Sequence, residues 1–201
     1  MNVLVLGASG QIARFAIDLF LNKTDANLTL YLRQASRING LRDRSKRLRV
    51  VEGDVLDLKS LESTMPGHDI VYANLDGQLE AQAKNVVTAM KHAGIRRLLW
   101  VSSMGIYTEV PGQNYRSVLD PYRDSAAVIE VSGLDYTLIR PAWLNDNDEI
   151  DYETTQKGEP FRNAGESVSR KSVADLIVRL AENPDMGNRS SLGVNKKEAR
   201  P

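Results

Sequence analysis

The chain begins with an apolar segment that runs directly into a glycine-containing turn. Residues 2–6 (NVLVL) have the β-branched and leucine-rich character of a buried strand, and residues 7–10 (GASG) follow at once. Ile12, Ala16 and Phe20 then recur at helical spacing. A strand that becomes a helix through so short a turn packs against that helix, so the start of the chain predicts a β–α unit.

The alternation of strand-like and helix-like segments continues along the chain. Further strands are expected at 28–32, 48–54, 69–74, 97–102 and 136–140. Further helices are expected at 59–65, 78–93 and 122–131, and after a Ser169 cap. This pattern is typical of βαβ units. We therefore expect a single α/β domain over residues 1–201, with a doubly wound, mostly parallel sheet flanked by helices and a loose tail from 195 to 201.

The composition excludes several functional classes. The 26 basic and 26 acidic residues cancel, which argues against a dedicated nucleic-acid binder. Cysteine is absent and the two histidines, His68 and His92, lie far apart. The sequence therefore excludes a disulfide framework and a cysteine nucleophile, and no metal is expected. The apolar run from Val3 to Leu6 is too short for a signal peptide or a membrane span, so we expect a cytoplasmic protein without membrane contact.

The glycine-containing turn has the context of a dinucleotide site. Gly7 permits the tight turn, Gly10 lets a pyrophosphate approach the backbone, and the small Ala13 lets the helix pack closely on the strand. The first N–H groups of the helix then face the phosphates. The alternative is a tight turn that binds no ligand.

The residue after the second strand indicates which dinucleotide is bound. An NAD site would place an acid there for the ribose 2′-hydroxyl, whereas this chain has Arg33, whose planar fork suits a 2′-phosphate. The same arginine disfavours an S-adenosylmethionine-dependent methyltransferase. Arg37 is a second candidate for the phosphate and Arg14 a third, unless Arg14 is only a surface residue. The basic residues from 42 to 49 are interpreted as a solvated helix face. We therefore expect NADP(H) to be preferred over NAD(H).

Two further strand ends provide polar side chains. Asp54 and Val55 follow the third strand, where a carboxylate would accept from the adenine amino group. The alternative is that Asp57 caps a helix and Asp54 lies in the turn. Asn74 ends the fourth strand and is expected to line the path of the cofactor, because ligands lie beyond the carboxyl ends of parallel strands.

Several longer segments resemble a known superfamily over nearly the whole chain. They are GASGQIA at 7–13, LYLRQASR at 30–37, GDVLD at 53–57, VVTAMKHAGIRRLLWVSS at 86–103, SGLDYTLIRPAWL at 132–144 and VSRKSVADLI at 168–177. Together they resemble the short-chain dehydrogenases/reductases, and within them the atypical NmrA-like branch that also contains biliverdin reductase B. The resemblance implies a Rossmann fold and an NADP site formed by Gly7, Ser9, Gly10, Gln11, Ile12, Arg33, Asp54, Val55, Asn74, Pro141, Ala142 and Trp143. It also implies a serine near the nicotinamide, which here is Ser102.

The chain departs from that superfamily at its usual proton donor. Short-chain dehydrogenases use a tyrosine with a lysine four residues later, which lowers the pKa of the phenol. No tyrosine here is followed by lysine at that spacing; Tyr122 is the best placed, with Arg123 beside it. We expect Tyr122 and Ser102 to line an acceptor site.

Two functions then remain. The first is a reductase that passes hydride to a small-molecule acceptor needing little proton help, such as a flavin or quinone. The alternative is a non-catalytic NADP(H)-binding sensor that regulates a protein partner. A homodimer is compatible with either.

An acidic segment lies late in the chain. Asp146, Asp148, Glu149, Asp151 and Glu153 fall within eight residues that contain no base. We interpret them as a solvated loop or an active-site lid rather than as metal ligands. Trp143, just before them, either stacks on a substrate ring or packs in the core.

Overall fold

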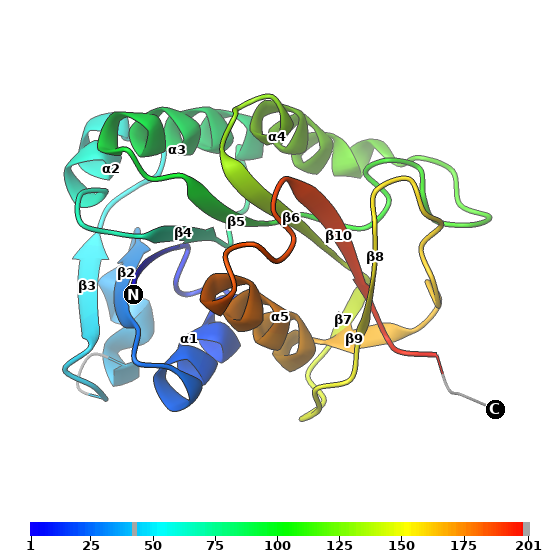
Figure 1. The fold of residues 1–201 in the computed structure, drawn as a ribbon, viewed down its shortest axis with the longest axis horizontal. Helices are drawn as coiled ribbons and strands as arrows, with labels where there is room; N and C mark the ends of the chain where they lie inside the picture. The colour runs from blue at the N-terminus through cyan, green and yellow to red at the C-terminus, as the bar shows by residue number, and fades with distance from the viewer. Residues whose placement is uncertain (42–43, 199–201) are drawn as a thin grey trace.

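The computed structural model describes residues 1–41 and 44–198 and places a β-sheet between two layers of helices (Figure 1). The strands of this sheet are β1 (Asn2–Leu6), β2 (Asn27–Leu32), β3 (Leu48–Glu52), β4 (Ile70–Ala73), β5 (Arg97–Val101), β6 (Asp135–Pro141), β8 (Glu153–Thr155) and β10 (Ser190–Asn195). Within the described residues their order is β3-β2-β1-β4-β5-β6-β10-β8, and every neighbouring pair is parallel except β10 with β8. The predicted doubly wound, mostly parallel sheet is confirmed.

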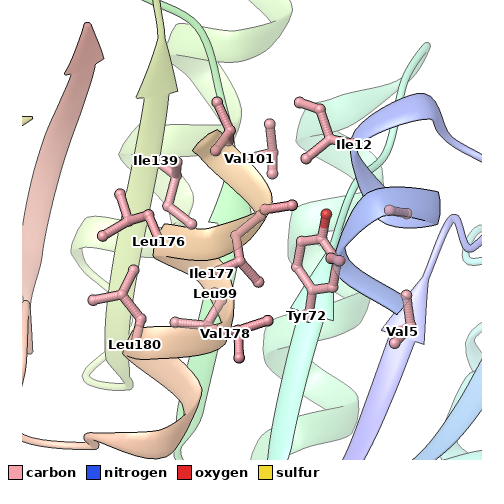
Figure 2. Close-up of a cluster of buried hydrophobic side chains, with 14 of the residues drawn as sticks. Val5, Ile12, Tyr72, Leu99, Val101, Ile139, Leu176, Ile177, Val178 and Leu180 are labelled. Atoms are coloured by element: carbon pink, nitrogen blue, oxygen red, sulfur yellow. The ribbon is translucent and has the colours of Figure 1, made fainter. Parts of the chain in front are cut away.

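Helices cover both faces of the sheet, as predicted. They are α1 (Gln11–Lys23), α2 (Leu58–Thr64), α3 (Leu79–Ala93), α4 (Asp120–Glu130) and α5 (Arg170–Glu182). α1 and α5 lie on one face, and α2, α3 and α4 lie on the other (Figure 1). Figure 2 shows the first face, where Ile177 of α5 lies beside Tyr72 and Leu99 of the sheet. Burying both faces leaves only the edges and ends of the strands for ligands.

The helix ends follow local chemistry that the sequence shows. At the start of α2, the Asp57 side chain accepts a hydrogen bond from the Ser60 backbone N–H at 3.2 Å. At the start of α5, the Ser169 hydroxyl accepts one from the Ser172 N–H at 2.9 Å. Gly94 ends α3 with a φ of 73°, a conformation in which glycine has no side-chain clash. The interpretation of Asp57 as a helix cap is thus correct.

Four strands in the second half of the chain were missed. They are β7 (Trp143–Asn145), β8, β9 (Ser167–Ser169) and β10, of which β7 and β9 form a separate parallel pair. β7, β8 and β9 have three residues each and are too short to show an alternating pattern, whereas β10 has six residues. The sequence analysis placed the start of a loose tail at Asn195, which is too early. Asn195 is buried, ends β10 and pairs with Glu153. Residues 199–201 lie outside the described residues.

The basic stretch after β2 differs from the solvated helix that the sequence predicted. Residues 35–41 form a short 3-10 helix, and Leu48 already begins β3. Arg47 donates to the carbonyl oxygens of Leu21 and Thr24, at 2.6 Å each, at the end of α1. That arginine therefore caps a helix, a role that depends on contacts distant in sequence. Residues 42 and 43 lie outside the described part of the chain.

Candidate cofactor groove and acceptor pocket

Two cavities lie at the carboxyl ends of the parallel strands. The large cavity, of about 610 Å³, spans the ends of β1 to β4 and is lined by Gly7, Ser9, Gly10, Tyr31, Leu32, Arg33, Gln34, Arg37, Gly53, Asp54, Val55, Asn74, Leu75, Asp76 and Gln82. The small cavity, of about 280 Å³, lies beyond β5 and β6 and is lined by Ser103, Met104, Gly105, Thr108, Val110, Gln113, Asn114, Tyr115, Arg116, Val118, Leu119, Pro141, Ala142 and Trp143. Because β4 and β5 are neighbours in the sheet, the two cavities lie along one edge.

The glycine turn packs directly against the end of β4. Gly7 has a φ of 76°, and a Cβ at Gly7 would overlap the Asn74 carbonyl oxygen. A Cβ at Gly10 would overlap the Asn74 side-chain amide. Gly10 is also the N-cap of α1 and offers no side chain to its first N–H groups. The turn is therefore a bare backbone cradle at a helix N-terminus, which fits the pyrophosphate of a dinucleotide.

The predicted phosphate arginines divide into two groups. Arg33 and Arg37 are exposed and line the large cavity, at the end of β2 and in the 3-10 helix that follows. Arg14 instead donates to the carbonyl oxygens of Ser9 and Arg37, at 3.2 Å each. Arg14 thus ties the glycine turn to the 3-10 helix and holds the wall on which Arg37 lies.

The far end of the large cavity is formed around Tyr31. Its hydroxyl donates to the Asp54 carbonyl oxygen at 3.1 Å, and its ring fills the space where Gly53 would have a side chain. Burial raises the pKa of the Tyr31 phenol. The Asp54 carboxylate accepts from the Leu56 N–H at 3.0 Å, as expected of a turn. Asp54 and Val55 both line the cavity. The hydrogen bond that Asp54 makes in the turn therefore leaves this residue within reach of a ligand.

The residues of the large cavity that were not predicted from the sequence include Tyr31, Asp76 and Gln82. Tyr31 lies inside a predicted strand, and Asp76 and Gln82 lie beyond the fourth strand. Gln82 donates to the Asp76 carbonyl oxygen at 3.1 Å, and its own carbonyl oxygen is buried without a partner among the described residues. A buried acceptor of this kind suits a donor from a ligand. The sequence could have indicated Asp76, because this residue follows the end of a predicted strand. No sequence pattern indicated Gln82.

A buried ion pair holds the wall of the small cavity. Arg140, at the end of β6, is fully buried and donates to the Glu109 carboxylate and to the Ser191 hydroxyl, the latter at 2.9 Å. Glu109 also accepts from the Gly105 and Tyr107 N–H groups, at 3.0 and 2.9 Å. This pair therefore fixes the loop that follows β5. Sequence reasoning missed both partners, although a charged residue in a buried strand is a signal of pairing.

Neither of the two residues predicted to line the acceptor site is among the lining residues of the small cavity. Ser102 is 5% exposed, and its hydroxyl has no hydrogen-bond partner within residues 1–41 and 44–198. Its neighbour Ser103 lines the cavity. Tyr122 is half-buried against the α3 and α4 side of the core. Burial, aided by the Asp76 carboxylate, raises the pKa of the Tyr122 phenol.

The only cation that the sequence placed beside Tyr122 is engaged elsewhere. Arg123 lies 3.0 Å from the Asp124 carboxylate and 3.2 Å from that of Asp120. It therefore does not replace the missing lysine. Gln11 and Ile12, at the N-terminus of α1, do not line the large cavity, whereas Pro141, Ala142 and Trp143 line the small one.

The acidic segment is neutralised by bases from distant parts of the chain. Asp146 pairs with Arg170 at 2.9 Å, and Lys196 lies 2.8 Å from both Glu149 and Asp151. None of these acids lines either cavity. In the described part of the chain, no group of three or more histidine, aspartate or glutamate side chains forms a metal site. None of the described helices is long and apolar enough to cross a membrane.

A bare glycine turn beneath an arginine-lined cavity, at the switch point of a parallel sheet, defines a dinucleotide-binding α/β protein. The chain belongs to the family described as NAD(P)H-binding, which it matches over residues 7–184.

Two solved structures share the fold over nearly their whole length. A Rossmann-fold NAD(P)-binding family protein from Shigella flexneri is 42% identical, with a TM-score of 0.86, over 100% of this chain and 97% of that one. A short-chain dehydrogenase/reductase from Veillonella parvula DSM 2008, solved in complex with NADP, is 29% identical, with a TM-score of 0.88, over 97% and 94%. The predicted Rossmann fold and the resemblance to short-chain dehydrogenases are confirmed.

Two curated relatives, each 24% identical, have different names. Quinone oxidoreductase 2 of Escherichia coli (strain K12) aligns with 72% of this chain, which spans half the length of that protein. An uncharacterized sugar epimerase of Bacillus subtilis (strain 168) aligns over 94% of this chain and 92% of its own length.

Proposed function

We propose that this protein is an NADPH-dependent reductase that passes hydride to a small, flat, conjugated acceptor such as a quinone or a flavin. The observation that supports this most is the pair of cavities along one sheet edge. The large cavity is polar and has the glycine cradle, and the small one has mostly apolar walls. A dinucleotide with its phosphates in the cradle and its adenine toward Tyr31 would extend along the edge toward β5 and the small cavity.

The preference for NADP(H) is proposed from the charges at the end of β2. Arg33 and Arg37 line the large cavity there, and their guanidinium groups suit a 2′-phosphate. The nearest acid in sequence to this strand end within the cavity is Asp54, beyond β3. The structural relative solved with NADP supports the same choice.

The class of acceptor is proposed from the missing tyrosine–lysine pair, which would otherwise donate a proton. Burial and the Asp76 carboxylate raise the pKa of Tyr122, and the neighbouring Arg123 is engaged by two aspartates, so the phenol is a poor proton donor at neutral pH. When bound, the nicotinamide supplies the hydride: NADPH, a quinone and a proton give NADP⁺ and the hydroquinone. Such an acceptor spreads the incoming charge over its own oxygens and takes its proton from water. The relative named as a quinone oxidoreductase supports this proposal.

The direct test measures NADPH oxidation by the purified protein with a panel of acceptors. We expect simple quinones or flavins to accelerate the loss of NADPH absorbance at least tenfold over background, and a nucleotide sugar to have no effect. If no acceptor accelerates the oxidation while NADPH still binds, the reductase proposal is wrong. Epimerisation of a nucleotide sugar by the NAD(P)-loaded protein would also contradict it.

The second candidate function is a redox sensor that binds NADP(H) without turnover. The observation that favours it is the missing tyrosine–lysine pair, together with the engagement of Arg123 by two aspartates. A sensor must bind the oxidised and reduced cofactor unequally, because only differential affinity shifts a conformational equilibrium. Equal dissociation constants for NADP⁺ and NADPH, measured by calorimetry, would reject the sensor.

Removal of the Ser102 hydroxyl is expected to separate catalysis from stability. Because that hydroxyl has no partner in the described residues, Ser102→Ala should leave the melting temperature unchanged or slightly higher. If the hydroxyl meets the nicotinamide or the acceptor, kcat/KM should fall about tenfold, the value of one hydrogen bond. Ser63→Ala on α2 is the control, since that hydroxyl bonds only to the Ser60 carbonyl oxygen. An unchanged kcat/KM would remove Ser102 from the acceptor site.

A further inference from the structure

Among the residues that the structure describes, one charged side chain lies in the walls of the small cavity. Its lining is apolar or uncharged apart from Arg116. Arg116 is exposed and, within the part of the chain that the structure describes, forms no ion pair. A long cation at the mouth of an apolar pocket requires an explanation, because the chain pairs most of its other charges near this site.

The acids near Arg116 are committed to other partners. Asp120 accepts from the Tyr115 hydroxyl at 2.7 Å and lies 3.2 Å from Arg123, which also pairs with Asp124. Glu109, in the loop that follows β5, is buried and bound by Arg140. Arg123 is further held over the Tyr115 ring, with its guanidinium carbon 5.1 Å from the ring centroid. Arg116 is thus the one lining cation left to meet a ligand in this cavity.

The apolar walls around Arg116 suit a flat ring system. Met104 and Val110, in the loop that follows β5, are buried and line the cavity. Trp143, on the β6 side, is 52% exposed, which is unusual for so large an apolar ring and leaves its face available for stacking. A ligand with an aromatic body and one anionic substituent would pack against the apolar walls and pair with Arg116.

We propose that the acceptor has an anionic group, a carboxylate or sulfonate, and that Arg116 binds this group while the flat body lies against Trp143 and Met104. The proposal rests on the reductase function above and makes it more specific. Arginine suits the role because its fork can donate two parallel hydrogen bonds to such an anion. Partial shielding by the apolar walls strengthens the attraction relative to open water.

The kinetic test compares a neutral and an anionic acceptor, 1,4-naphthoquinone and 1,2-naphthoquinone-4-sulfonate, each measured with wild type and variant. Because each acceptor is compared only with itself, the different potentials of the two quinones cancel. We expect Arg116→Gln to lower kcat/KM for the sulfonate about tenfold and to change it less than twofold for the neutral quinone. Arg116→Lys should recover part of the loss. Added salt should slow the sulfonate reaction of wild type more than that of the variant.

The control is Arg96→Gln, which removes the same charge from an exposed residue just before β5, at the opposite end of that strand. Arg96 is paired with Asp135 and lines neither the small nor the large cavity, so this change should leave the sulfonate reaction within twofold of wild type. An equal loss of kcat/KM for the sulfonate in both variants would mean that the overall surface charge causes the effect. Arg116 would then not be the residue that binds the anion. An equal loss for neutral and anionic quinones in Arg116→Gln would overturn this assignment as well.

A binding measurement separates this proposal from the reductase function. Naphthalene-2-sulfonate accepts no hydride, so its calorimetric affinity for the NADP⁺-loaded protein depends on the cavity alone. We expect Arg116→Gln to weaken that affinity about tenfold, with naphthalene-2-carboxamide as the neutral control. If quinones are not reduced but the sulfonate binds through Arg116, the reductase proposal fails and the anion site stands. If quinones are reduced but Arg116 does not affect the binding of the sulfonate, the anion site fails alone.

Discussion

Arg33→Asp is expected to raise the Kd for NADPH about 100-fold while changing the Kd for NADH less than threefold. The side chain lines the large cavity at the end of β2 and is exposed, so the substitution changes its charge without disturbing the core. Loss of charge-assisted hydrogen bonds to the 2′-phosphate, and the new repulsion from aspartate, together amount to about 2.8 kcal/mol for that ratio. Titration of both cofactors by calorimetry or quenching measures it.

The control for this change is Arg49→Asp. Arg49 is an exposed residue of β3 and does not line the large cavity, so the same change of charge there should alter neither Kd more than twofold. If the NADPH-to-NADH ratio is the same in Arg33→Asp as in wild type, Arg33 is only a surface residue. If Arg49→Asp has the same effect as Arg33→Asp, the long-range charge of this end of the sheet, rather than a contact, sets the preference.

Arg140→Met is expected to lower the free energy of unfolding by about 3–5 kcal/mol, because it leaves the Glu109 carboxylate buried without its cation. Both side chains are almost wholly inaccessible to solvent. Glu109 also holds the Gly105 and Tyr107 N–H groups, so the loop that walls the small cavity should loosen and quinone reduction should fall with stability. Urea unfolding followed by fluorescence gives the free energy.

Arg96→Met is the matched control, since Arg96 makes a two-fold contact with Asp135 at 2.8 and 3.2 Å on the surface. Exposed pairs of this kind contribute about 0–1 kcal/mol. Glu109→Gln added to Arg140→Met should recover at least half of the loss, because the orphaned charge is gone and one acceptor remains. Equal losses in Arg140→Met and Arg96→Met, or no recovery in the double variant, would show that burial of the charge is not the cause.

The amino-acid sequence was most informative where function depends on local backbone chemistry. The glycine turn can be recognised because a strand, two glycines and a helix occupy consecutive positions, and the turn of Gly7 and Gly10 against Asn74 matches that expectation. The caps at Asp57 and Ser169 are equally local. The strand ends in turn identified Arg33, Asp54 and Asn74 as residues of one edge, because parallel strands bring their carboxyl ends together.

Other features depend on contacts that no local pattern encodes. Arg47 had the appearance of a solvated charge, but it caps α1 from the segment just before β3. The short strands β7, β8 and β9 form because neighbouring strands provide their hydrogen-bond partners. The family resemblance placed Ser102, and the order of the chain placed Tyr122, at the acceptor site, whereas Ser103 and Tyr115 line the small cavity in the structure.

By itself, then, the sequence determined that this chain folds as a doubly wound α/β protein with a dinucleotide cradle at its first turn, and that its second strand ends in arginine rather than in an acid. Only the tertiary structure decided which charges are paired and which are left for a ligand. Glu109 and Arg140 are 31 positions apart and buried together, whereas Arg116 lines an apolar cavity whose described walls contain no acid. The physical reason is that a charge is neutralised by what surrounds it in space, and the surroundings of these side chains come from different strands and loops.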